Sequence, residues 1–65
     1  MKRNAIVRFY NENTGSEYII KEVVEMHVGE SYYIVTHIGL DPEEGYCYCE
    51  TAIPCNTYPN YEFIA

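Results

Sequence analysis

The chain has 65 residues and a formal net charge of −6, so we expect one domain, residues 1–65, with a small core and marginal stability. No stretch approaches the roughly 20 apolar residues of a membrane span, and the apolar run after residues 1–4 is too short for a signal peptide, which predicts a cytoplasmic protein without membrane contact. Direct nucleic-acid binding is not expected, because residues 22–65 hold eight carboxylates and no lysine or arginine to displace phosphate counterions.

Residues 5–10 predict a first strand, with Val7 and Phe9 on one face, and residues 11–16 predict a turn. Residues 17–28 are ambiguous. Their β-branched side chains favour a strand that pairs with the first one, whereas an apolar stripe and a capping-box pattern allow a helix at 16–27. We favour the strand, with these residues on one face: Tyr18, Ile20, Val24, Met26 and Val28.

Residues 28–39 predict the central strand, in which aromatic and β-branched residues lie between two glycines. Alternation places Tyr32, Ile34, Thr36 and Ile38 on one face and Tyr33, Val35 and His37 on the other. We expect the first face to be buried. The second, which carries Tyr33, is expected to be an outer surface that is partly used for contacts.

An acidic loop is predicted at residues 39–45, which include an Asp-Pro pair and a closing glycine. The strand after it alternates, with Tyr46, Tyr48 and Glu50 on one face and Cys47, Cys49 and Thr51 on the other, so we expect the cysteines to face the core. Residues 54–60 contain two prolines and predict a crossing, and residues 61–64 predict an edge strand. The fold class is therefore all-β: a small SH3-like barrel or a strongly bent antiparallel sheet of about five strands.

One pattern covers residues 28–65: Val28-Gly29-x-x-Tyr32-x-Ile34, an acidic turn, an alternating strand, and Tyr58-Pro59 shortly before Phe63. It resembles short SH3-like β-barrel proteins of phages and Gram-positive bacteria. The chain departs from that pattern at Glu30, where a lysine is usual, and it lacks the Asp/Gly-rich turn before the last strands. The resemblance implies a fold and no active site. Together with the small size and the acidic balance, it suggests a mobile-element product, which would place the protein in a host cytoplasm.

Three cysteines, an odd number, fit reduced thiols better than a disulfide framework, although Cys55 could still pair with Cys47 or Cys49. Together with His27 and His37 they raise the hypothesis of a zinc site, but a Cys-x-Cys pair inside a strand lacks the turn spacing of zinc knuckles. No spacing selects a catalytic group either. We expect no metal, no cofactor and no enzymatic activity.

The eight tyrosines far outnumber the two phenylalanines, and there is no tryptophan. Tyrosine is enriched at binding interfaces, although a small barrel also uses it as an amphipathic rim residue. All four basic residues lie in the first third of the chain, at Lys2, Arg3, Arg8 and Lys21. The acidic remainder therefore favours a partner with a basic surface, or serves only solubility.

The leading hypothesis is a non-enzymatic binding module, such as a phage inhibitor of a host nucleic-acid-handling or defence protein, of the anti-CRISPR or another anti-defence type, in which carboxylates mimic phosphates. The alternative is a small structural or self-associating phage or bacterial domain, such as an assembly accessory or a homodimer. The residues expected to bind the partner are Tyr33, Asp41, Glu43, Glu44, Tyr46, Tyr48 and Glu50.

Overall fold

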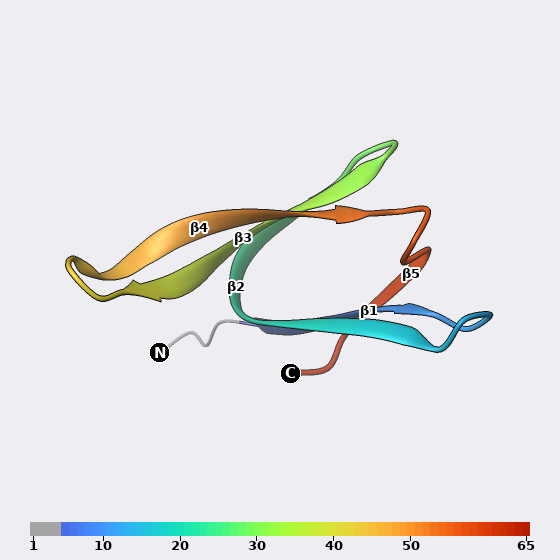
Figure 1. Ribbon diagram of the computed structural model, residues 1–65, viewed down its shortest axis with the longest axis horizontal. Coiled ribbons are helices and arrows are strands. Elements are labelled where there is room, and N and C mark those ends of the chain that lie inside the picture. Colours follow the sequence, from blue (N-terminus) through green and yellow to red (C-terminus); the bar gives the residue numbers. More distant parts are fainter. Residues whose placement is uncertain (1–4) are drawn as a thin grey trace.

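Figure 1 shows the computed structural model, which describes residues 5–65. The five strands are β1 (Ala5–Asn11), β2 (Ser16–Val28), β3 (Tyr32–Asp41), β4 (Gly45–Pro54) and β5 (Asn60–Phe63). They form one antiparallel sheet in the order β4-β3-β2-β1-β5. The predictions of an all-β fold and of a strand at residues 17–28 are confirmed. No helix long and apolar enough to cross a bilayer occurs in this part of the chain. Lys2 and Arg3 lie outside the described residues.

Strand β2 bends the sheet into two layers (Figure 1). Its first half pairs with β1 and its second half with β3, and Val23 pairs with both, opposite Ala5 and His37. The preceding residue, Glu22, has a φ of 58°, and the register shifts beside it in both ladders. The sheet is not closed into a barrel, since β4 and β5 lie at the two ends of the strand order. Of the two predicted forms, a small barrel and a strongly bent antiparallel sheet, the structure has the bent sheet.

The core lies between the two layers. Val7 and Phe9 are buried, as the alternation in the first strand predicts. On β2 the buried residues are Ile20 and Val23, an odd spacing that unbroken alternation forbids. The irregular backbone at Glu22 moves the inward face to Val23, and the register shift between Val23 and Glu25 moves it back, so that Met26 packs against the core and Val28 pairs with the buried Tyr33. Of the residues predicted to share one face of this strand, Val24 and Val28 are exposed.

The predicted faces of β3 are reversed. Tyr33 is only 4% exposed and Val35 is fully buried, whereas Tyr32 is 49% exposed. Opposite Tyr33 on β4 lies Ile53, which is also in the core. Both faces of β3 are largely apolar, so alternation separates the two sets of residues without indicating which set faces the core.

Aromatic rings hold the two layers together. The ring of Tyr33 lies 5.1 Å from that of Phe9 and 5.3 Å from that of Tyr61, between ring centroids. On the outer face of the β1 layer, Arg8 bonds to Glu17 and Glu62 at 3.1 Å each and thereby joins three neighbouring strands.

The far end of the β3–β4 hairpin extends beyond the two-layered part of the molecule (Figure 1). The β2–β3 ladder ends at the pair Val23 and His37, whereas the β3–β4 ladder continues to Asp41 and Gly45. Residues 38–48 therefore form a two-stranded ribbon, called the distal ribbon below. The Cα radius of gyration is 12.5 Å, against about 11 Å for a compact chain of this length, as expected for a molecule with a projecting hairpin.

Candidate interaction surface

An apolar patch covers one face of the distal ribbon. Direct cross-strand pairs place Leu40 beside Tyr46 and Ile38 beside Tyr48. These four residues are called the distal patch. Leu40, Tyr46 and Tyr48 are 72%, 79% and 74% exposed, the highest values among the large hydrophobic side chains of residues 5–65. The ribbon thus presents a row of apolar side chains to solvent.

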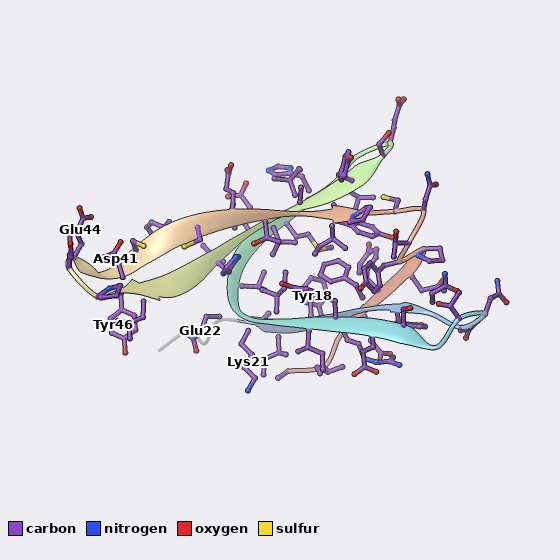
Figure 2. The ribbon with its side chains drawn as sticks, viewed as in Figure 1. Tyr18, Lys21, Glu22, Asp41, Glu44 and Tyr46 are labelled. Carbon is purple, nitrogen blue, oxygen red and sulfur yellow. The ribbon has the colours of Figure 1, made fainter. Side chains whose placement is uncertain are left out.

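The distal patch is slightly hollowed. One shallow depression is lined by Ile38, Tyr46, Cys47 and Tyr48, and a second extends past Leu40 to Glu22 at the bend of β2. In Figure 2 the side chain of Tyr46 points to the side of the ribbon on which Glu22 lies. An isolated two-stranded ribbon is marginally stable in water, so an exposed apolar face on it is expected to be completed by a contact.

Carboxylates surround the turn at the end of the ribbon. Oδ1 of Asp41 accepts hydrogen bonds from the backbone N–H groups of Glu43 and Glu44, at 2.8 and 3.2 Å, so one carboxylate fixes the turn that carries the other two. Gly45 closes the turn with a φ of 83°. Glu43 and Glu44 are exposed, and Figure 2 shows Glu44 on the side of the ribbon opposite Tyr46.

Farther along β4, Glu50 lies opposite Thr36 on the same face as the distal patch. Residues 32–54 contain these four carboxylates, Asp41, Glu43, Glu44 and Glu50, and no lysine or arginine. The hairpin therefore combines exposed tyrosines with a uniformly negative charge.

The opposite face of the hairpin carries the thiols. The Sγ atoms of Cys47 and Cys49 lie 3.9 Å apart, and Cys49 covers Gly39, where an added Cβ would approach the Cys49 Sγ to 2.7 Å. Hydrogen bonding with the Cys47 thiol, and then burial, raise the pKa of Cys49. Nε2 of His37 lies 2.7 Å from Oγ1 of Thr51.

Cys47 and Cys49 lie on the sheet face that carries the core residue Ile53, as the alternation predicts, but they are only half-buried and do not belong to the core. The β2–β3 ladder ends at His37, the residue opposite Cys49, so little of the opposing layer covers them. Cys55, by contrast, packs against the core. All three thiols are free, and residues 5–65 contain no cluster of three or more histidine, cysteine or acidic residues that could hold a metal ion.

Six of the seven sequence-predicted partner residues lie on the hairpin end or beside it: Asp41, Glu43, Glu44, Tyr46, Tyr48 and Glu50. Tyr33 does not belong with them, because it is buried beneath Phe9 and Tyr61 and offers no surface to a partner.

Sequence reasoning missed Ile38 and Leu40 as surface residues. Gly39 suggested the end of the strand, but β3 continues through it to Asp41. The available signal was the alternation of Ile38 with Leu40, which places both on the face of Thr36.

Other tyrosines have structural contacts. The ring of Tyr18 meets that of Tyr58 edge-on at 6.3 Å, and the Arg8 guanidinium lies 4.2 Å from the centroid of the Tyr10 ring. The tyrosine-rich composition is therefore divided between packing around the core and exposure on the hairpin.

No family model, curated protein or solved structure matches this chain.

Proposed function

We propose that the chain is a non-enzymatic binding protein that docks on a basic protein surface through the distal ribbon. The observation that carries this proposal is the combination of exposed Leu40, Tyr46 and Tyr48 with neighbouring carboxylates that have no cation beside them on the hairpin. Rigid aromatic side chains supply contact area at low entropic cost, and uncompensated charge attracts a partner of opposite sign.

The carboxylates of the β1 layer differ from those of the hairpin in having a cation beside them, and this difference supports the proposal. Arg8 lies between Glu17 and Glu62, so the negative charge of the β1 layer is partly compensated. The turn residues Glu43 and Glu44 have no such cation beside them in the hairpin sequence. Long-range attraction of a cationic surface is therefore directed to the hairpin end of the molecule.

The partner class that we propose is a nucleic-acid-handling protein, including host defence proteins. Such proteins bind phosphates with clustered lysine and arginine, and carboxylates on a rigid turn can occupy the same positions. DNA or RNA is then expected to compete with the protein for its partner, while the protein itself has no measurable affinity for either.

The test is affinity capture of a partner from a host cell lysate, followed by binding measurements with charge-reversed variants. Replacing Glu43 and Glu44 by lysine changes the net charge from −6 to −2, since each change adds two units. Glu12→Lys with Glu30→Lys makes the same change at two exposed positions outside the hairpin. We expect the first pair to slow association about tenfold or more and the second pair to have a much smaller effect.

Equal effects of the two variants would mean that only net charge matters, and unchanged binding in both would mean that the carboxylates serve solubility. A homodimer whose interface covers the distal patch would favour the structural alternative instead. Static light scattering of the pure protein measures whether such a dimer forms.

A further inference from the structure

The outer edge of β4 is unprotected. Strand β4 is the last strand of the sheet and pairs only with β3 among the described strands. Sheet edges are usually protected by lysine, proline, a bulge or short length, because their free N–H and C=O groups recruit other strands. Between Tyr46 and Ala52 there is no lysine or proline, and the ten-pair ladder with β3 runs without a register shift. At the other edge, β5 has only four residues.

The ladder alternation identifies the free backbone groups. The N–H of Cys55 donates to the carbonyl of Ser31 at 2.9 Å. In an antiparallel ladder every second pair exchanges hydrogen bonds, so the odd-numbered residues of β4, such as Ile53 opposite Tyr33, bond to β3. The even-numbered residues of β4 then point their N–H and C=O groups away from β3, and the carbonyl of Pro54 does so, since it accepts a hydrogen bond from the N–H of Tyr58 at 3.0 Å. The outward-facing residues are Tyr46, Tyr48, Glu50 and Ala52.

We propose that this edge binds an extended cationic segment of the partner, which adds to the sheet as an antiparallel strand beside β4. This inference rests on the proposed function and specifies its binding mode. Antiparallel addition continues the pattern of the whole sheet. Backbone bonds to four residues of β4 supply affinity, and side chains supply selectivity.

The side-chain requirements follow from the two faces of β4. On one face, residues of the added strand lie directly beside Tyr46, Tyr48 and Glu50, within about 5 Å. Lysine or arginine there pairs with the Glu50 carboxylate and lies against tyrosine rings. On the other face the neighbours are Cys47, Cys49 and Thr51, which suit small apolar side chains. The fitting segment therefore alternates basic and apolar residues.

A second copy of the chain is the competing occupant. Its β4 carries one carboxylate and no cation over residues 45–54, and each copy bears a net charge of −6. Charge complementarity therefore favours the cationic segment.

The experiment uses the full chain, labelled with ¹⁵N, and capped synthetic peptides of about nine residues, long enough to span Tyr46 to Ala52. One peptide alternates lysine with valine, and a second alternates glutamate with valine. Two further lysine peptides carry N-methyl groups on either the lysine or the valine amides. With lysines beside Tyr46 and Tyr48 in an antiparallel strand, the lysine amides face β4, so methylation there is expected to weaken binding at least tenfold. Methylation of the valine amides is expected to leave it unchanged.

Amide hydrogen exchange provides the direct measurement. In the free protein the amides of Tyr46, Tyr48, Glu50 and Ala52 are expected to exchange much faster than those of Cys47 and Cys49, which are bonded to β3. Saturation with the lysine peptide should slow the first set about tenfold or more. Ala52→Pro removes one outward donor at a position where an edge strand tolerates proline, and it should weaken binding, whereas Ala52→Thr should not.

The outcomes separate this inference from the proposed function. Shifts at the distal patch without amide protection, or equal binding of both methylated peptides, overturn strand addition but leave a basic partner in place. Equal binding of the glutamate peptide contradicts both. Protection of the β4 amides in a free dimer overturns the inference in favour of a second copy. If Ala52→Pro does not fold, the methylated peptides still decide.

Discussion

Tyr33 and Tyr48 have the same side chain in very different surroundings. Tyr33 lies in the core against Phe9, and its pKa is raised by burial and further by the neighbouring Cys55 thiol. Tyr48 lies on the distal ribbon with most of its surface in water. The residue type therefore does not show whether a tyrosine packs between the layers or is open to a contact, whereas its exposed fraction does.

The raised pKa of Tyr33 predicts a loss of stability in alkali. A phenol with a higher pKa in the folded than in the unfolded state contributes no pH dependence below about pH 10, its unfolded value. As the pH rises further, the unfolded state ionises first and the free energy of unfolding falls. We expect the urea midpoint to fall less steeply with pH above this value in Tyr33→Phe than in the parent. Tyr48→Phe is the exposed control, and an identical slope in Tyr33→Phe would contradict this origin.

At the scale of elements, the period-two alternation in the sequence predicts the strands well. The first strand, the strand at 17–28, the central strand and the alternating strand after the acidic loop all occur, as does a short edge strand near the end. Turn residues also mark the connections: Gly15 and Gly45 have positive φ, as turn chemistry favours.

The bend could not be placed from the sequence. It occurs at Glu22, which interrupts the apolar face of the strand but is a residue type with no preference for positive φ. The faces of β3 and the exposure of Cys47 both depend on where the second layer ends, which is set by this bend. Of the candidate surface, the acidic turn and the two tyrosines could be predicted, because a turn and its adjoining strand are local in sequence.

The bend itself can be tested by two substitutions at Glu22. Valine resists a φ of 58° because its β-branched side chain meets the backbone, whereas asparagine tolerates it. Both changes remove the carboxylate and its contacts, so their difference isolates the backbone. We expect Glu22→Val to be less stable than Glu22→Asn by about 1–2 kcal/mol in urea unfolding. Equal stabilities would show that the bend does not require this conformation.

At the scale of the whole molecule, the two ends differ in packing and in charge. One end holds the core, the aromatic contacts and the Arg8 ion pairs with Glu17 and Glu62. The other end is the distal ribbon, which carries the apolar patch and the acidic turn outside the two-layered part. Substitutions on the ribbon are therefore expected to change binding with little effect on the core.

This division predicts that salt and side-chain removal act on different rates of partner binding. Carboxylates at the turn attract a cationic surface over distance, so raising the salt concentration from 50 to 300 mM should lower the association rate about tenfold and change dissociation little. Tyr48→Ala removes a packed anchor and should raise the dissociation rate about tenfold, with association and the free energy of unfolding nearly unchanged. Surface plasmon resonance with the captured partner measures both rates, and Tyr18→Ala, outside the hairpin, is the control. A salt effect confined to dissociation, or a Tyr48→Ala effect no larger than that of Tyr18→Ala, would place the contact elsewhere on the molecule.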